Sequence, residues 1–552
     1  QPLLSHGPSL HSHTHIHLSL SLSLSLSLSH THSHTHTMLL ALKPFACLSL
    51  FCLSLIVFLL TPHDKRSNIP SQQYTIHSHY HPYNLQQEQI IIQQRTSSNA
   101  PTSCKGSRIY IHKLPPEFNT DLLQKCGYGI TSWLNFCAHI AHHGLGEPLH
   151  THEELSLSQD KVSTKSANDT NFMKFLDKQS PTRIRKMLLG DISPPSLRRH
   201  RSEWHRTDSY MLEVIFHSRL LHYPCLTDDP NMADAFFLPY YAGLDALKYL
   251  YGEHKSNPKV AQHGSNLVSW LQQDAIAKEA WRKHRGQDHF LVMGRTPWDF
   301  GNLGSAQWGT GILQIPEYAN MTLLLVEKQL WMPNQYAIPY PTSFHPNSPS
   351  SLHAWINRVQ NERRSTLFAF AGSIRPALMR GGIRDMLIDQ CLSSKDCKLL
   401  DCKELKCSHN PEPIMRTFLL SQFCLQPRGD TPTRRSLFDA IIAGCIPVIF
   451  HNDTAYTQYE WLLPKEASKW SVYIDEEEIR KGTLVEETLL KYTEESVSQI
   501  REVLIGMIPK VVYNAGYSSS NEGEADAFDV SVRETLKLIS HKKRKLTSFR
   551  KL

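Results

Sequence analysis

The sequence predicts an α/β protein built from two Rossmann-like doubly wound halves that face a cleft. The chain has 552 residues, a length that suits two to four domains. Its residues are 40% hydrophobic and 20% charged, which excludes collagen-like, wholly disordered and polytopic membrane proteins. Short apolar strand-like segments alternate with helical segments in two successive stretches, and no internal repeat is evident. We therefore expect a ligand between the halves, outside the carboxyl ends of the strands.

Residues 1–37 form a low-complexity segment of Ser, Leu, His and Thr without a single charged Asp, Glu, Lys or Arg. A two-letter repeat of this kind cannot build a packed core. We interpret it as a leader outside the mature protein, which would begin at Met38. The alternative is that the His-rich tract around His11 to His17 binds a metal ion.

Residues 39–60 are apolar apart from Lys43 and two serines, and Asp64 begins the charged sequence that follows. The uninterrupted run is close to the roughly 17–25 residues that span a bilayer. No small-residue cleavage site follows it, so we predict a signal anchor. Basic residues flank both ends of this apolar segment. The positive-inside rule therefore barely distinguishes the two orientations of the segment in the membrane. Residues 61–103, rich in Gln, Ser, His and Tyr, are predicted to form a stem.

Cysteines and glycosylation sequons favour a body on the oxidising, lumenal side of a secretory membrane. The sequons begin at Asn168, Asn320 and Asn452. Four closely spaced cysteines raise the alternative of a zinc site, but they include no Cys-x-x-Cys pair. We prefer disulfides, whose connectivity the sequence leaves open. The cysteines beyond the anchor are Cys104, Cys126, Cys137, Cys225, Cys391, Cys397, Cys402, Cys407, Cys424 and Cys445.

The N-terminal lobe is predicted to span residues 104–346. Buried strands are expected at residues 108–112, 235–238 and 289–293, because each is a short apolar run that ends in a loop. The polar stretch 154–207 is expected to be an inserted loop.

The C-terminal lobe is predicted to span residues 364–540, with a strand at 367–371 and a helix around 384–391. The basic tail 541–552 holds six Lys and Arg residues and no acid, and we expect it to be a frayed, solvated end. Without these six cations the formal charge falls from +7 to +1, so the body offers no basic face for nucleic acid.

The most informative stretch runs from residue 418 to residue 450. It reads as a strand (418–425), a polar turn (427–430), a short helix that begins near Thr431 or Thr433, and a second strand (446–450). A glycine-bearing loop that opens a helix presents unpaired backbone N–H groups to an anion.

Arg428, Arg434 and Arg435 cluster at this helix start, and Arg375 ends an earlier strand of the same half. Guanidinium groups suit phosphate, whereas three of them at a helix start repel one another and oppose the helix dipole. An anionic ligand would relieve that conflict. The alternative is a surface turn with solvated arginines.

This stretch closely resembles the exostosin-type glycosyltransferases, in particular their plant xyloglucan galactosyltransferase-like branch. The resemblance extends from Cys104 to about Leu538. One departure is His112-Lys113, where relatives usually carry an acid before the Leu-Pro. Further matching motifs are Tyr110-Ile-His-Lys-Leu-Pro115, Asp234-Ala-Phe-Phe-Leu-Pro-Tyr-Tyr241, Asp288-His-Phe290, Gly294-Arg-Thr-Pro-Trp-Asp-Phe300, Ile338-Pro-Tyr-Pro341, Phe370-Ala-Gly-Ser-Ile-Arg375 and Ser471-Val-Tyr-Ile474.

The resemblance implies a fold of the GT-B type with the nucleotide-sugar in the C-terminal half. It also implies an inverting, metal-independent transfer from UDP-galactose to xyloglucan side chains, without a cofactor, by a single-pass type II Golgi membrane protein that works beside other Golgi glycosyltransferases. The sequence itself contains no Asp-x-Asp triplet to hold a divalent metal ion. Alternatives are another UDP-sugar donor such as UDP-galacturonic acid or UDP-arabinose, another hemicellulose or pectin acceptor, and a non-catalytic glycan-binding role.

An inverting transfer needs a carboxylate or a His in the N-terminal half to take the proton of the acceptor hydroxyl. Asp299 is the first choice for this base, since it lies in a loop just past the end of a predicted strand. Its neighbours Trp298 and Phe300 could stack on a sugar. His289 and His217 are the alternatives, and each of the three has a purely structural alternative reading. Asp439 is expected to position Arg435 or the ribose, and Glu460 is a second ribose candidate. The expected donor-binding set is Arg375, Arg428, Gly429, Thr433, Arg434, Arg435, Ser436, Asp439 and Glu460.

Overall fold

The computed structural model describes residues 104–130, 135–149, 203–250, 262–301, 308–374, 382–405, 407, 410–515 and 525–549. All of them belong to one compact unit, residues 83–552. The predicted leader, anchor and stem lie outside the described residues, as do Asn168 and Arg375. Among the residues that are described, no helix has the length and apolar character needed to cross a membrane.

The N-terminal half contains a parallel sheet of five strands, arranged in their sequence order. Strands predicted near residues 110, 236 and 291 are confirmed, and two further strands follow that the sequence did not reveal. The strands are β1 (Ile109–Ile111), β2 (Ala235–Phe237), β3 (His289–Met293), β4 (Thr322–Leu325) and β5 (Gln335–Ala337).

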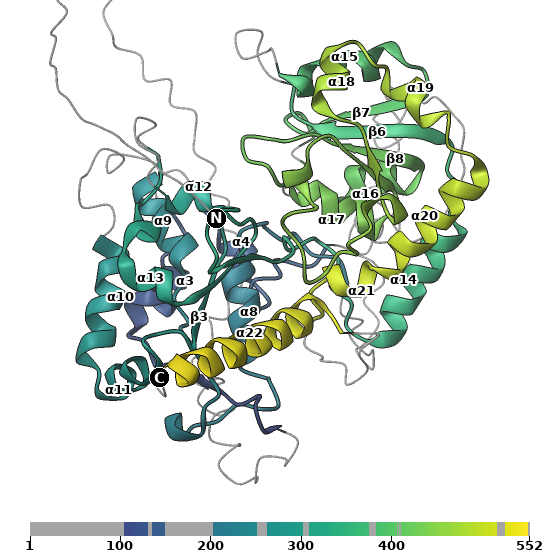
Figure 1. Ribbon diagram of the computed structural model, residues 1–552. Coiled ribbons are helices and arrows are strands. Elements are labelled where there is room, and N and C mark those ends of the chain that lie inside the picture. Colours follow the sequence, from purple (N-terminus) through teal and green to yellow (C-terminus); the bar gives the residue numbers. More distant parts are fainter. Residues whose placement is uncertain are drawn as a thin grey trace, which may run out of the picture. The chain divides into compact units, whose positions relative to one another are not determined.

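Helices cover both faces of this sheet (Figure 1). Alternate side chains of a strand point to opposite faces. Phe236 and His289 face Trp281 of α11, whose ring centroid is 5.1 Å from that of His289. On the other face Phe237 contacts Phe216 of α8, with 6.2 Å between ring centroids. The main helices of this half are α8 (Leu212–Leu220), α9 (Ala242–Leu250), α10 (Gln262–Gln273) and α11 (Ala275–His284).

The C-terminal half contains a second parallel sheet of five strands, in the order β10-β9-β8-β6-β7. This is a doubly wound order, in which the chain leaves β6 for one edge and returns through β8 on the other side. The prediction of doubly wound halves is therefore confirmed in strand order for this half, whereas the N-terminal sheet advances in one direction. The strands are β6 (Thr366–Gly372), β7 (Cys397–Asp401), β8 (Ser421–Gln426), β9 (Ile446–Ile449) and β10 (Val472–Tyr473).

One boundary prediction in this half was wrong. Phe418 belongs to α16 (Glu412–Leu419), and the strand expected from residue 418 begins only at Ser421. Ile414, Met415, Phe418 and Leu419 are buried, so helical spacing of apolar residues decides the structure here.

Further helices of the described residues, from four to 23 residues long, connect or flank these elements. The helix predicted around residues 384–391 is confirmed as α15. The remaining helices are α3 (Thr120–Gln124), α4 (Cys137–Ile140), α12 (Pro297–Phe300), α13 (Pro316–Asn320), α14 (Pro349–Asn361), α15 (Ile383–Ser393), α17 (Arg435–Ile442), α18 (Glu476–Arg480), α19 (Val485–Leu489), α20 (Glu494–Gly506), α21 (Ile508–Val511) and α22 (Ala527–Phe549).

The C-terminal helix α22 (Figure 1) returns to the N-terminal half, and Phe528 at its start packs against Phe216 of α8, with 4.8 Å between ring centroids. The Nζ atom of Lys542 donates to Thr322 Oγ1 at 3.0 Å, and Lys543 Nζ donates to the Asp234 carbonyl at 3.1 Å. The prediction of a frayed end was therefore wrong for residues 541–549, which continue α22, whereas the predicted exposure to solvent holds for Arg544 and Lys545.

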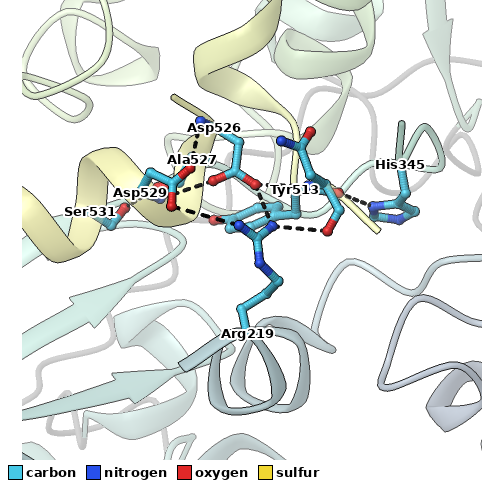
Figure 2. Close-up of polar contacts among 8 residues, drawn as sticks. Arg219, His345, Tyr513, Asp526, Ala527, Asp529 and Ser531 are labelled. Atoms are coloured by element: carbon cyan, nitrogen blue, oxygen red, sulfur yellow. Dashed lines mark hydrogen bonds and ion pairs between the residues drawn. The ribbon is translucent and has the colours of Figure 1, made fainter. Parts of the chain in front are cut away.

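A buried ion pair joins α8 to the start of α22 (Figure 2). Arg219 donates to Asp526 Oδ2 at 2.5 Å and to the Asn514 carbonyl at 2.9 Å. Its guanidinium also lies 3.7 Å from Asp529 and over the ring of Phe528. Asp526 is fully buried. This network links the segment that leaves the C-terminal half to a helix of the N-terminal half.

Five disulfides pair all ten cysteines that follow the predicted anchor. The zinc interpretation of the four-cysteine cluster is corrected, since each of its members is bonded to another cysteine. The pairs are Cys104–Cys225, Cys126–Cys137, Cys391–Cys397, Cys402–Cys407 and Cys424–Cys445. Two predicted glycosylation sites, Asn320 and Asn452, have exposed side chains.

Candidate functional site

The point where strand order reverses lies between β6 and β8, and α17 begins beside it. In doubly wound sheets ligands bind in the crevice that forms at such a point. The residue that precedes α17 is Arg434, in extended backbone, and no side chain caps the helix. The first turn of α17 therefore presents backbone N–H groups that can donate hydrogen bonds to an anion.

Close packing fixes the position of α17. Leu437, Phe438 and Ile441 are fully buried on the helix. Gly444 follows the helix with φ of +63°, and a Cβ atom there would lie 2.5 Å from Val359. Only glycine tolerates this combination, so the helix ends where β9 must begin.

Two arginines meet at the carboxyl end of β6. Arg434 Nη2 donates to the Ala371 carbonyl at 3.0 Å, and Arg384 Nη2 donates to the Ser373 carbonyl at 2.9 Å. Both guanidinium groups lie over the ring of Phe370, 5.6 and 5.8 Å from its centroid. Sequence reasoning missed Arg384, whose signal was its place at the start of the helix after β6. Two positive charges thus lie next to the uncapped start of α17.

Ser436 holds Arg434 in place. Its hydroxyl donates to Gln426 Oε1 at 2.6 Å and accepts from Arg434 Nε at 3.2 Å. Gln426 is fully buried at the end of β8. Ser436 was predicted to contact the donor, and the structure places it as a support for the arginine.

Arg428 also lies at this edge, but its forked donors are occupied. Its Nε and Nη2 atoms donate to the two carboxylate oxygens of Glu476 at 2.9 and 3.0 Å. Gly429 donates its N–H to the Thr431 carbonyl, and a Cβ atom on Gly429 would meet nothing closer than 3.8 Å. Glycine is therefore not sterically required at this turn.

Arg435 points toward the N-terminal half and away from Arg434. It donates to the Thr207 carbonyl at 2.7 Å and to Ser343 Oγ at 2.8 Å. Its Nε atom is 3.6 Å from Asp439 Oδ2. Burial raises the pKa of Asp439, and the positive charge of Arg435 opposes that rise. This geometry agrees with the prediction that Asp439 positions Arg435.

Thr433 connects the two halves through Glu327, a residue that sequence reasoning missed. The Thr433 N–H and hydroxyl both donate to Glu327 Oε2, at 2.8 and 2.7 Å. Burial raises the pKa of Glu327, the hydrogen bonds from Thr433 lower it, and the negative charge of Asp299 raises it further. The available signal was an acid placed directly after a run of buried apolar residues, at the carboxyl end of β4.

Asp299 lies in α12, just beyond the carboxyl end of β3, and is buried. Its Oδ2 atom accepts from Arg295 Nε at 2.6 Å and its Oδ1 atom accepts from Trp308 Nε1 at 2.9 Å. The neighbouring Trp298 is 40% exposed, whereas Phe300 is fully buried. Phe300 therefore packs in the core, and of the two predicted stacking residues only Trp298 faces solvent.

Glu213, on α8, supports the carboxyl ends of the strands in the N-terminal sheet. Sequence reasoning also missed this residue. Its Oε1 atom accepts from the N–H groups of Gly243 and Gly294, at 2.6 and 2.8 Å. These glycines lie at the start of α9 and just after β3, so Glu213 ties the ends of β2 and β3 together. Burial raises its pKa to about 8, although the backbone hydrogen bonds and Arg295 oppose the shift.

We predict that Glu213→Gln changes the pH dependence of stability. The pKa of Glu213 is raised from 4.5 to about 8 on folding, so the wild type loses stability as pH rises through this interval. Gln does not titrate. Thermal melts from pH 5 to 8.5 should therefore show the variant gaining stability relative to the wild type as pH rises. Glu117→Gln, an exposed control, should follow the wild type. A pH-independent difference between wild type and Glu213→Gln would contradict this assignment.

Both histidine candidates are buried. His217 is buried, its Nδ1 atom is 2.8 Å from Tyr241 Oη, and burial lowers its pKa to about 4. His289 is at the amino end of β3, the edge opposite Asp299, and is fully buried. Its ring nitrogens lie 2.9 Å from Asp288 and 3.2 Å from His112. The structure does not bring His289 to the edge that holds Asp299.

Glu460 forms an ion pair with Lys328, and its side chain is 59% exposed. The adjacent Trp461 stacks on Tyr336 with 4.6 Å between ring centroids. The predicted ribose ligand thus participates in a contact between the C-terminal half and the end of the N-terminal sheet.

Positive charge and free helix N–H groups therefore lie on one half, and carboxylates lie at the facing strand ends of the other. The first set suits a diphosphate, and the second suits proton transfer. Within the described ranges, no group of three or more His, Cys, Asp or Glu side chains is arranged to hold a metal ion.

Comparison with known proteins gives a family match. Residues 103–489 match the model of the exostosin GT47 domain. Xyloglucan galactosyltransferase MUR3 of Arabidopsis thaliana is 39% identical over 447 residues, which cover 80% of this chain and 64% of MUR3. The probable xyloglucan galactosyltransferase GT19 of the same plant is 39% identical over 455 residues, covering 80% and 92%. This chain thus spans just under two thirds of MUR3 and most of GT19.

Solved structures resemble the chain only loosely. A crystal structure of a mutant of S. aureus TarM with Fondaparinux, alpha-GlcNAc-glycerol and UDP aligns at 10% identity, covering 48% of this chain and 58% of that one, with a TM-score of 0.27. The GtfA/B complex aligns at 9% identity, covering 51% and 61%, with a TM-score of 0.25. Scores this low support no statement about this chain.

Proposed function

The chain belongs to the exostosin GT47 family of glycosyltransferases, and we propose that it transfers a galactosyl residue from UDP-galactose to side chains of xyloglucan with inversion at the sugar carbon. The observation that carries the proposal is the uncapped start of α17 beside Arg434 and Arg384, at the point where strand order reverses. The proposal includes a GT-B arrangement of the two halves.

The leaving diphosphate is stabilised by Arg434, Arg384 and the N–H groups of α17. Donors fixed in place before reaction stabilise developing charge without reorganisation, so no metal ion is required. Asp299 accepts the proton of the xyloglucan hydroxyl as that oxygen attacks the galactosyl carbon from the face opposite the diphosphate. Trp298 offers an exposed apolar ring for a sugar. Glu327 keeps the donor loop next to this edge through Thr433.

We further propose that the protein is a single-pass type II Golgi membrane protein with a lumenal body. Five disulfides support an oxidising compartment. The exposed side chains of Asn320 and Asn452 support glycosylation at both positions. The anchor itself is inferred from residues 39–60 of the sequence.

The proposal is tested by incubating the full chain with a panel of UDP-sugars and with xyloglucan oligosaccharides, with and without a chelator. We expect transfer from UDP-galactose, a product with inverted configuration, and no loss of rate with chelator. Transfer from another UDP-sugar alone would correct the donor. Absence of transfer from every UDP-sugar would reject the enzyme proposal, and a rate lost with chelator and restored by manganese would reject the metal-free mechanism.

We predict that Arg434→Gln weakens UDP binding by about 10- to 100-fold, because a hydrogen bond to a charged group contributes about 1.5–3 kcal/mol. Calorimetric titration with UDP measures the effect. Arg416→Gln is the matched control, since Arg416 is exposed on α16 and, among the described residues, forms an ion pair with Glu412 alone, on the same helix. Equal affinity of the Arg434 variant and the control would place the diphosphate elsewhere.

A further inference from the structure

A cavity of about 540 Å³ lies at the opposite edge of the N-terminal sheet from Asp299. Asp234 directly precedes β2 and His284 ends α11, so the cavity lies at the amino ends of the strands, between α11 and α22. A five-residue strand such as β3 spans roughly 15 Å, which separates the cavity from the candidate transfer site. Its polar lining consists of Asp234, His284, Ser540, Lys543, Arg544 and Ser548.

Positive charge dominates this cavity. Asp234 is the single carboxylate among its lining residues, and one of its oxygens accepts the Arg108 N–H at 2.9 Å. Arg544 makes no ion pair within the described part of the chain, and the same holds for the adjacent Lys545 and for Arg282 and Arg285 at the end of α11. Concave walls of low dielectric concentrate the field of such charges and attract anions.

The contacts of the neighbouring Lys542 indicate that little negative charge lies near this end of α22. Its Nζ atom donates to a neutral hydroxyl, Thr322 Oγ1, at 3.0 Å. Burial lowers its pKa to about 8. The basic end of α22 therefore packs against the sheet, and Lys542 has no carboxylate partner among the described residues.

The chemistry of the lining selects among anions. Among the described lining residues no Phe, Tyr or Trp is present, so this lining offers no large aromatic ring on which a nucleobase could stack. The described lining residues include no exposed large apolar side chain that could enter a bilayer. Anionic lipid is concentrated in the cytoplasmic leaflet, on the side of the membrane opposite the proposed lumenal body. A lipid surface is therefore a poor match for this cavity. Arg544 supplies a fork that matches a carboxylate, and Ser540, Ser548 and His284 match sugar hydroxyls.

We propose that this cavity binds uronate residues of an acidic polysaccharide. It is a second glycan site, separate from galactosyl transfer, and it holds the enzyme on an acidic polymer while the opposite sheet edge stays open to the acceptor. The proposal does not depend on which donor or acceptor the transfer site uses.

The test compares binding of the full chain, in detergent, to polygalacturonate and to neutral xyloglucan by affinity electrophoresis. We expect retardation by polygalacturonate that declines with salt. The double variant Lys543→Gln with Arg544→Gln should bind polygalacturonate at least about tenfold more weakly than the wild type. The control Lys469→Gln with Lys481→Gln removes the same charge from exposed positions of the other half and should bind as the wild type.

Several results would overturn the proposal. These are equal loss in both double variants, unchanged binding in the cavity variant, and retardation by neutral xyloglucan equal to that by polygalacturonate. Competition by inorganic phosphate as effective as that by oligogalacturonate would show that charge alone is recognised, and would also reject it. Galactosyl transfer to neutral oligosaccharide should persist in the cavity variant, which shows that it is folded. Binding retained by a wild-type protein that transfers no sugar would count against the proposed function and leave this site standing.

Discussion

Asp299→Asn is expected to lower kcat by about 10²- to 10⁴-fold, the range contributed by a positioned general base. The amide keeps the size of the carboxyl group and its oxygen still accepts a hydrogen bond, but it cannot take the acceptor proton. Asp299 is held by Arg295 and Trp308 at 2.6 and 2.9 Å, so its position is fixed before substrate binds. Steady-state rates with UDP-galactose and a xyloglucan oligosaccharide measure the effect.

The affinity for UDP should change little in this variant, because Asp299 belongs to the N-terminal half, whereas the proposed diphosphate site is at the start of α17 in the C-terminal half. Asp245→Asn is the matched control, since Asp245 is another buried, ion-paired aspartate of the same half, bonded to Tyr240 and Lys248. Its kcat should stay near the wild-type value even if stability falls. An Asp299→Asn enzyme with more than one tenth of the wild-type kcat would show that another group accepts the proton. Glu327 would then be the next residue to test.

The local part of the site could be predicted from sequence. Residues 418–450 contain a strand, turn, helix and strand whose signals are apolar spacing, a glycine after the helix and arginines at its start, and each of these lies within a few residues of the feature it predicts. The strand–turn–helix–strand order was confirmed, and the error at Phe418 arose where helical and strand-like spacing overlap.

The partners of these residues could not be predicted. Thr433 and Glu327 are 106 residues apart in sequence, and Glu213 is 81 residues from Gly294. Such contacts depend on tertiary packing, which local periodicity does not encode: Thr433 and Glu327 join the two halves, and Glu213 and Gly294 meet within the N-terminal half. The same limit explains Arg435, which looked like a phosphate ligand but donates to Thr207 and Ser343 of the other half.

The basic C-terminus shows a further limit. Charge runs usually mark solvated ends, and composition alone led to that prediction. The helix that carries the charges is anchored at its start by Asp526 and near its end by contacts of Lys542 and Lys543 with strand ends, so these two lysines pack against the N-terminal sheet.

Arg219→Met is expected to lower the free energy of unfolding by about 3–5 kcal/mol, the cost of leaving a buried charge without its partner. Met retains much of the packing of the side chain against Phe528 but leaves Asp526, which is fully buried, without the guanidinium. Because the pair joins α8 to α22 (Figure 2), the loss should appear as lower resistance to urea and to heat in the whole folded body.

A double-mutant cycle separates the ion pair from the packing. In the wild type the backbone N–H of Asn514 donates to Asp526 Oδ2 at 2.8 Å. Asp526→Asn removes the buried charge and keeps an oxygen that can still accept this hydrogen bond. The double variant should therefore be less destabilised than the sum of the single variants by at least about 1 kcal/mol. The same cycle on Lys469 and Glu466, an ion pair whose side chains are 59% and 67% exposed, should give a coupling energy below about 1 kcal/mol. Equal coupling in the two cycles would mean that the Arg219 pair does not hold α22 to the N-terminal half.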